Sequence, residues 1–190
     1  MLPWPVGLME CGMRLAHSFA RRLAVVACGF GLSGAAVAAE TVDMGTDVPD
    51  AKVIKEGLFP EETCKELEAS GFKCMGFKPA VRFSLPTANF KLGSAELPDL
   101  LRKQLDVFAD VLRGKRGTGR VLRIEGHADA SGGSAANQQL TQKRAEAVRS
   151  YLVDHGAENS MLEAVGLGSS EPKMRNNPYA AENRRVEIGR

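Results

Sequence analysis

The sequence predicts an α+β fold in which a mixed four-stranded sheet carries two main helices packed on one face. Four short segments, at residues 81–85, 120–128, 162–167 and 185–188, are typical of strands, and most of them alternate apolar and polar residues. Two longer segments between them carry apolar residues at helical spacing and end at glycines. The resulting order, β-α-β-α-β-β, allows both helices to cover the same face of the sheet.

The first strand and the first main helix lie between residues 80 and 114. Residues 81–85 alternate as a strand does, a proline follows, and residues 90–92 alternate again. A helix begins at about residue 98 and ends at Gly114, with its apolar residues on one face. We therefore expect this helix to pack on the sheet through that face.

The second half of the chain supplies the remaining elements. In order, we expect a strand over residues 120–128, a glycine-containing loop over 129–135, a helix from about 136 to 155, a strand over 162–167, a loop to 178, a helical turn over 180–183 and a last strand over 185–188.

Length and charge exclude several classes of protein. The 190 residues suffice for one ordinary domain with attachments, and 44% of them are hydrophobic, which is typical of a folded chain. Lys and Arg total 25 against 23 Asp and Glu, so the chain lacks the basic excess of a nucleic-acid-binding protein. The three His and four Cys residues show no zinc-site spacing. We predict no metal, no cofactor and no nucleic-acid partner.

Residues 1–39 have the pattern of a secretory signal peptide. Basic residues precede an uncharged run from Leu23 to Ala39, and small residues end it, which indicates cleavage near Ala38 or Ala39. An alternative is a lipid on Cys28, although the apolar run before this cysteine is short. Either reading predicts an exported protein.

Residues 40–79 form an extension ahead of the main domain. Residues 40–57 lack clear periodicity and are expected to be a mobile leader, whereas residues 60–70 favour a short helix. Cys64 and Cys74 are the two cysteines left after export, and two cysteines in an exported protein are expected to form a disulfide. Two free buried thiols are the alternative.

The second main helix contains an unexpected charge. On a helical wheel, Arg144 falls inside the apolar arc between Leu140 and Val148, and Asn137 lies on the same line two turns earlier. A guanidinium on a buried stripe is costly unless an acceptor meets it. The nearest obvious carboxylate is Asp129, so the two form either an internal salt bridge or a ligand site.

The opposite arc of this helix is polar and points away from the apolar stripe. It carries Gln138, Gln139, Gln142, Lys143, Glu146, Arg149 and Ser150.

Five ordered motifs between residues 80 and 190 resemble the OmpA-like peptidoglycan-binding domain, a family that includes domains of OmpA, the peptidoglycan-associated lipoprotein and MotB. The family pattern is Gly-His-Thr-Asp, Asn-x-x-Leu-Ser-x-x-Arg-Ala and a closing Asn/Asp-Arg-Arg-Val-Glu, with a Ser-Ala-x-Leu and a Gly-x-Gly-x-x-x-Pro segment. The matching segments are residues 90–97, 126–129, 137–145, 166–172 and 183–188.

The resemblance implies that Asp129 and Arg144 bind the free end of diaminopimelate in the peptide stem of peptidoglycan. That end carries an ammonium beside a carboxylate, so one fixed anion and one guanidinium fork match it. Asn137 and Arg185 match family positions that line the pocket. Arg184 is a weaker candidate, because adjacent residues of a strand face opposite ways.

Two positions depart from the family pattern. Ala128 replaces the usual Thr, which removes a hydroxyl beside the pocket, and Thr141 replaces Ser. Neither change removes a charge. His127 belongs to the motif, and we interpret it as a structural hydrogen-bonding residue.

We interpret the chain as an exported, non-catalytic protein that binds peptidoglycan in the periplasm of a Gram-negative-type envelope, associated with the cell wall and outer membrane. A wall hydrolase, the first alternative, needs a metal cluster, an acid–base pair or an activated nucleophile, and the sequence shows none. In the second alternative, residues 40–79 bind an outer-membrane or other envelope protein and residues 80–190 only anchor the chain.

Overall fold

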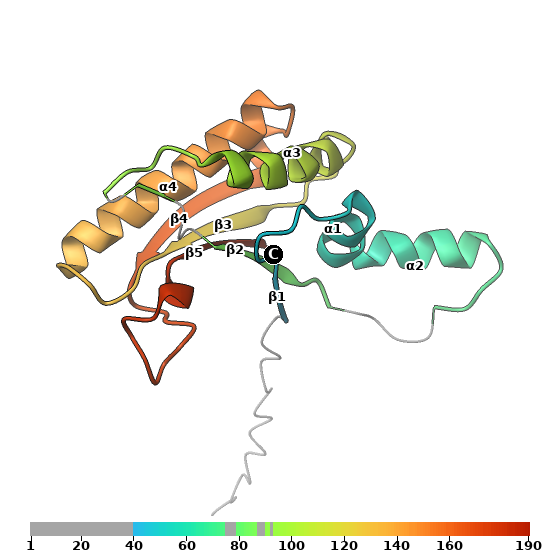
Figure 1. Ribbon diagram of the computed structural model, residues 1–190. Helices are drawn as coiled ribbons and strands as arrows, with labels where there is room; N and C mark the ends of the chain where they lie inside the picture. The colour runs from blue at the N-terminus through green and yellow to red at the C-terminus, as the bar shows by residue number, and fades with distance from the viewer. Residues whose placement is uncertain (1–39, 75–78, 87–89, 92) are drawn as a thin grey trace, which may run out of the picture. The chain divides into compact units, whose positions relative to one another are not determined.

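The computed structural model describes residues 40–190 except 75–78, 87–89 and 92. The predicted signal peptide, residues 1–39 with Cys28, lies outside the described residues. The described chain forms one sheet with its main helices on one face (Figure 1). Its helices are too short or too polar to cross a lipid bilayer.

The sheet is mixed, as predicted, but it has five strands rather than four. Its strands are β1 (Thr41–Asp43), β2 (Arg82–Pro86), β3 (Leu122–His127), β4 (Leu162–Gly168) and β5 (Arg185–Gly189). They lie in the order β1-β2-β5-β3-β4, with β5 antiparallel to both β2 and β3. The pairs β1–β2 and β3–β4 are parallel.

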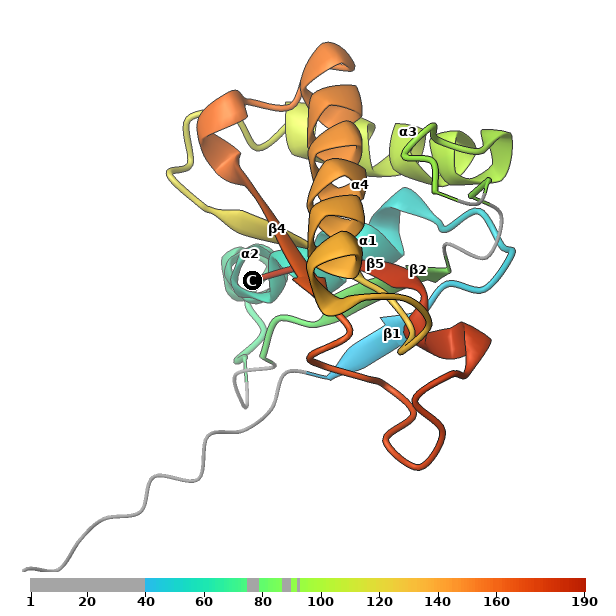
Figure 2. The ribbon, with the colours of Figure 1, turned by 90° about the vertical axis from the view of Figure 1, so that its left-hand side faces the viewer.

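Two long helices, α3 (Asp99–Arg113) and α4 (Ser134–Asp154), lie on the same face of the sheet (Figures 1 and 2). Shorter helices are α1 (Ala51–Leu58), α2 (Pro60–Ala69) and 3-10 turns at Asn159–Met161 and Ala181–Asn183. The core lies between the helices and the sheet, where the rings of Phe83 and Phe108 meet edge to face at 5.6 Å. The predicted α+β architecture is confirmed.

Helix α4 lies very close to β3 and β4 because two glycines face it. A Cβ added at Gly126 would lie 2.3 Å from the carbonyl oxygen of Thr141, and one added at Gly166 would lie 2.3 Å from the backbone nitrogen of Gln142. Any larger side chain at either position would force the helix away from the sheet. The two glycines therefore determine where the first half of α4 lies.

Polar side chains of α4 cover the free edge of β4. Gln142 accepts a hydrogen bond from the backbone N–H of Gly166 at 2.6 Å, and Gln138 donates to the carbonyl of the same glycine. Arg149 donates to the carbonyl of Leu162 at 3.0 Å. These hydrogen bonds satisfy backbone N–H and C=O groups at the edge of β4, which could otherwise pair with another strand. The polar arc of the helix is thus partly a contact surface.

Residues 40–57, predicted to be a mobile leader, are instead part of the folded structure. Strand β1 pairs with β2, and α1 begins after Asp50, whose carboxylate accepts a hydrogen bond from the Lys52 N–H at 2.7 Å. Ile54 and Leu58 are buried in the core. The prediction was wrong because both elements are short, with three residues in β1 and eight in α1, and short segments are difficult to distinguish from a loop in the sequence.

The segment after β2 was predicted to be a strand, and this prediction was wrong. Phe90 and Lys91, expected to continue a strand, belong to no strand, and Leu92 lies outside the described residues. Phe90 is nevertheless buried. Its apolar side chain packs without strand pairing, a distinction that alternation alone cannot make.

The predicted disulfide between Cys64 and Cys74 is confirmed, with Cα atoms 5.5 Å apart. It ties α2 to the segment that leads into β2. Glu61 of α2 also pairs with Arg190 at 2.7 Å and with Arg120 at 3.1 Å. The extension is therefore connected to the main domain by charged contacts as well as by the chain.

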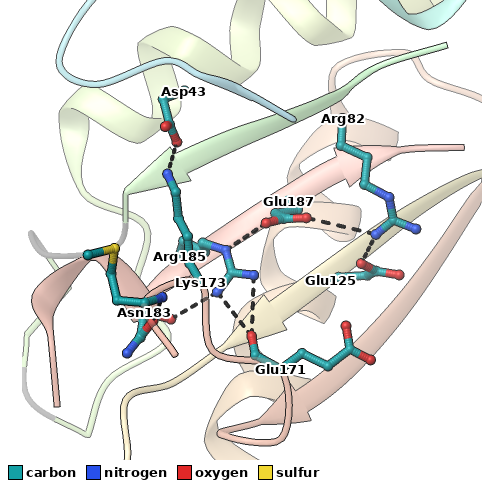
Figure 3. Close-up of polar contacts among 9 residues, drawn as sticks. Asp43, Arg82, Glu125, Glu171, Lys173, Asn183, Arg185 and Glu187 are labelled. Carbon is teal, nitrogen blue, oxygen red and sulfur yellow. Dashed lines mark hydrogen bonds and ion pairs between the residues drawn. The ribbon is translucent and has the colours of Figure 1, made fainter. Parts of the chain in front are cut away.

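The face of the sheet away from α3 and α4 carries a buried cluster of charged side chains (Figure 3). Glu187 accepts a hydrogen bond from Arg185 at 2.6 Å, and Glu125 pairs with Arg82. Arg82 also lies 3.8 Å from Glu187, so the ion pairs link β2, β3 and β5. This mutual pairing allows charges to be buried there.

His127 lies on the same polar face, opposite Arg185 in the β3–β5 register. Its ring is buried, and neither ring nitrogen makes a hydrogen bond of ordinary geometry with the described residues. Burial, followed by the positive charge of Arg185, lowers the pKa of His127 to about 4. The imidazole is therefore neutral at neutral pH.

Replacing Gly166 with alanine should destabilise the fold. Its Cβ would collide with the backbone of α4, which cannot move as a flexible side chain can, so we expect the free energy of unfolding to fall by about 1–3 kcal/mol. Gly114→Ala is the control, since Gly114 has a φ of −74° and its nearest neighbour would lie at 3.4 Å. Equal urea midpoints for the two variants would contradict the close-contact argument.

Acid should destabilise the protein through His127. The folded-state pKa of about 4 lies below the ordinary value of 6.5, so the unfolded chain takes up the proton first as the pH falls. Stability present above pH 6.5 is lost between pH 6.5 and 4, by roughly 3 kcal/mol for this group. Denaturant unfolding across this range should show a shallower pH dependence for His127→Gln than for the wild type. The exposed His155, changed to Gln, should keep the wild-type dependence.

Candidate functional site

Asp129 follows β3, where the chain turns toward α4. Its Oδ1 accepts a hydrogen bond from the N–H of Ser131 at 2.9 Å, and its Oδ2 accepts one from Nη1 of Arg184 at 2.6 Å. The residue is 6% exposed. Two partners thus hold the carboxylate in one orientation at the end of the strand.

Opposing effects act on the ionisation of Asp129. Burial alone would raise the pKa of its carboxyl group, but hydrogen bonds from Arg184 and Ser131, with the charge of Arg184, outweigh burial. The pKa of Asp129 is consequently below its ordinary value. The group remains an anion at neutral and weakly acidic pH.

Asn137, in the first turn of α4, holds the loop that carries Asp129. Its Nδ2 donates to the carbonyl of Asp129 at 3.1 Å and to the carbonyl of Ser131 at 2.8 Å. The sequence placed Asn137 at the pocket, and the structure places it next to Asp129. Both of its amide hydrogens are engaged with main chain, so Asn137 positions the loop.

Arg144 lies two turns further along α4 and is 6% exposed. Its Nε donates to the carbonyl of Ser94 at 3.0 Å, and its guanidinium carbon lies 4.6 Å from the centre of the Phe90 ring. Among the described residues, nothing bonds its terminal nitrogens, Nη1 and Nη2. Burial and, secondarily, the charge of Arg184 lower the pKa of Arg144. The guanidinium of Arg144 is therefore held in place through its Nε, while its two terminal nitrogens have no partner among the described residues.

Arg184 and Arg185 lie on opposite sides of the chain. Arg184 reaches Asp129, and its charge also acts on Arg144, so Arg184 lies near both residues. The structure places Arg185, predicted to line the pocket, on the other face of the sheet, paired with Glu187 (Figure 3). The alternation itself indicated this arrangement, because Arg184 shares the parity of the buried Val186.

The predicted alternative of a salt bridge between Asp129 and Arg144 is not what the structure shows. Asp129 pairs with Arg184, and within the described part of the chain no ion pair reaches Arg144. One carboxylate beside two guanidinium groups gives the site a formal charge of +1. Such a site suits a ligand that offers a carboxylate to the guanidinium groups and a cation to Asp129.

Away from the Asp129 site, one group of side chains in the described residues has the spacing of metal ligands. The ligand atoms of Glu125, His127 and Glu187 lie within 4.8 Å of one another on the polar face. Both carboxylates, however, are bound by Arg82 and Arg185. These guanidinium groups occupy the carboxylate oxygens and oppose a cation, so the donor set does not favour a metal.

Known relatives are similar to part of this chain. The peptidoglycan-associated lipoprotein of Pseudomonas aeruginosa is 35% identical over 107 residues, which cover 55% of this chain and 62% of the relative. Outer membrane porin F of Pseudomonas fluorescens is 44% identical over 68 residues, or 35% of this chain and 21% of the porin. The chain thus spans less than two thirds of these relatives.

A solved structure supports the fold. The putative MotB like protein from Desulfovibrio vulgaris aligns with a TM-score of 0.50 at 24% identity, covering 72% of this chain and 91% of that one. The sequence profile of the OmpA family matches residues 89–185, which is slightly more than half of the chain and includes Asp129, Asn137, Arg144 and Arg184. The chain therefore belongs to the OmpA family.

Proposed function

We propose that this protein binds peptidoglycan non-covalently, without catalysis, through the free end of diaminopimelate in the peptide stem. The observation that carries the proposal is the arrangement of Arg144, whose guanidinium is fixed by Ser94 and Phe90 while its terminal nitrogens have no described partner. The name of the Pseudomonas aeruginosa relative, peptidoglycan-associated lipoprotein, supports peptidoglycan as the ligand.

The chemistry of the ligand matches the charges of the site. The free end of diaminopimelate carries an ammonium and a carboxylate on one carbon. The carboxylate would bind between Arg144 and Arg184, and the ammonium would bind Asp129, whose lowered pKa keeps it ionised. Binding the carboxylate also offsets the positive charge of the site, which a neutral amide at that position could not do.

The proposed location is the periplasm of a Gram-negative-type envelope. Relatives named as an outer membrane porin and a peptidoglycan-associated lipoprotein support it, as does the disulfide, which is typical of exported proteins. In this proposal residues 1–39 are the leader, residues 40–79 the extension and residues 80–190 the wall-binding domain.

The proposal predicts that the purified protein sediments with diaminopimelate-type peptidoglycan, and that Asp129→Asn or Arg144→Gln abolishes sedimentation. Each substitution removes one of the two opposite charges that the ligand requires. Asp154→Asn and Arg175→Gln, which change exposed charges elsewhere, should sediment as the wild type does. Circular dichroism would verify folding, and unchanged sedimentation of both site variants would reject the proposal.

Changing Arg184 to Gln should weaken binding at pH 7, because one of the two guanidinium groups is lost, and should raise the pH at which the remaining binding falls to half. Without Arg184, Asp129 loses a hydrogen bond and a positive charge that both lower its pKa, so the pKa rises and the carboxylate is protonated at a higher pH. Sedimentation measured from pH 7 to pH 4 should therefore fail earlier in this variant than in the wild type. Arg175→Gln removes a positive charge without touching Asp129, and a coincident pH profile for both variants would contradict this role of Arg184.

A further inference from the structure

An apolar groove lies outside the wall-binding site, between the extension and the margin of the sheet. It has a volume of about 390 Å³. We call it the extension groove and define it by six of its lining residues, Val42, Val53, Cys64, Leu67, Val81 and Phe83. Helices α1 and α2 form one wall, and strands β1 and β2 form the other. A cavity of this size is typical of ligand-binding clefts.

Apolar side chains around the extension groove are exposed to water. Val53 is 48% exposed and Leu67 is 44% exposed, although both line the groove. Phe72, two residues before the groove residue Cys74, is 66% exposed. Apolar residues gathered around one hollow are characteristic of interaction sites, whereas isolated ones are ordinary.

The strand that borders the groove has an unpaired edge. Strand β1 is the last strand of the sheet on its side (Figure 2). The carbonyl of Glu40 accepts from Arg82 at 2.8 Å and the N–H of Met44 donates to Ser84 at 2.9 Å, so residues of this parity face β2. Thr41 and Asp43 direct their backbone groups the other way, where no described residue forms a backbone hydrogen bond with them.

The charges at the groove are acidic. Glu40 and Glu56 both line it. Glu56 lies 3.8 Å from the exposed Lys52, a distance and exposure that give a weak ion pair, and Glu40 has no ion pair among the described residues. A basic side chain of a partner would therefore be favoured beside these carboxylates.

We propose that the extension groove binds an extended segment of a partner polypeptide that pairs with the outer edge of β1. Backbone hydrogen bonds to Thr41 and Asp43 would add the segment to the sheet, an established mode of peptide recognition. Alternate side chains would face the groove, an apolar one against Val42 and Leu67 and a basic one beside Glu40 or Glu56. This function goes beyond peptidoglycan binding and does not depend on it.

The extension groove is preformed in the absence of a partner. The Cys64–Cys74 disulfide forms part of its lining and closes α2 onto the following segment. The pairing of Glu61 with Arg190 fixes the start of α2 to the end of the chain. A preformed groove lowers the ordering cost of binding.

Peptide titration of the isotope-labelled protein, monitored by NMR, tests the binding mode. The probe is the acetylated and amidated peptide Thr-Lys-Thr-Val-Thr-Lys-Thr, and its control carries Glu in place of both Lys. We expect the basic peptide to slow hydrogen exchange of the Thr41 and Asp43 amides at least tenfold, and the acidic peptide to leave exchange unchanged. Equal effects of the two peptides, or no change at these amides, would overturn the proposal.

Variants locate the site. Leu67→Glu and Glu56→Lys should weaken binding of the basic peptide at least tenfold, whereas Val121→Glu, at a position 50% exposed and outside the groove, should not. Leu67→Glu should still sediment with peptidoglycan, so failure of this proposal is distinguishable from failure of wall binding. Equal weakening by Val121→Glu would show that the groove is not the site.

Photo-crosslinking in cells identifies the occupant. A photoreactive residue at position 67 of the full chain should capture a segment of another protein with alternate apolar and basic residues, as read by mass spectrometry, and Glu56→Lys should abolish the adduct. Cross-links confined to residues 75–78 of the same chain, links only to a second copy, or none at all would each overturn the proposal.

Discussion

The contact of α4 with β3 and β4 is the constraint on which the rest of the structure depends. Gly126 and Gly166 let the helix backbone approach the sheet to a distance that no side chain would allow. At that distance, Gln138 and Gln142 reach the edge of β4, and Asn137 reaches the loop after β3. The same contact sets the position of Arg144 over Phe90 and Ser94. The packing of α4 and the geometry of the candidate site thus both depend on the close approach of α4 to β3 and β4.

The two faces of the sheet use arginine differently. On the helix side, Arg144 is fixed through its Nε and ring contact and has terminal nitrogens without a described partner, while Arg184 orients Asp129. On the other face, Arg82 and Arg185 form ion pairs with buried carboxylates. A guanidinium already paired with a carboxylate has fewer donors left for a ligand, whereas one with free donors can recognise an anion. The adjacent Arg184 and Arg185 illustrate both cases.

Most of the fold was predictable, because long elements carry many periodic positions. Helices α3 and α4 and strands β2 to β5 were all expected within a few residues, and the cysteine count indicated the disulfide. Strand β1 and helix α1 were not predicted, since they are only three and eight residues long. At the candidate site, Asp129, Asn137 and Arg144 were predicted from the motif and from the charge on an apolar arc, and their role in binding stays a prediction. Arg184 was ranked below Arg185 because adjacent residues of a strand face opposite ways and Arg185 was assigned to the pocket side, whereas the structure places Arg184 there.

The sequence alone determined the class of fold, the order of its longer elements and the charge of Arg144 on a buried stripe, because these depend on local spacing along the chain. The number of cysteines left after export indicated the disulfide. Only the tertiary structure decided which partner each charge meets. Asp129 and Arg184 are 55 residues apart in sequence and 2.6 Å apart in space. The extension groove likewise exists only where α1 and α2 meet the margin of the sheet. Pairings across such separations follow from how elements pack, and packing depends on contacts that no single segment contains.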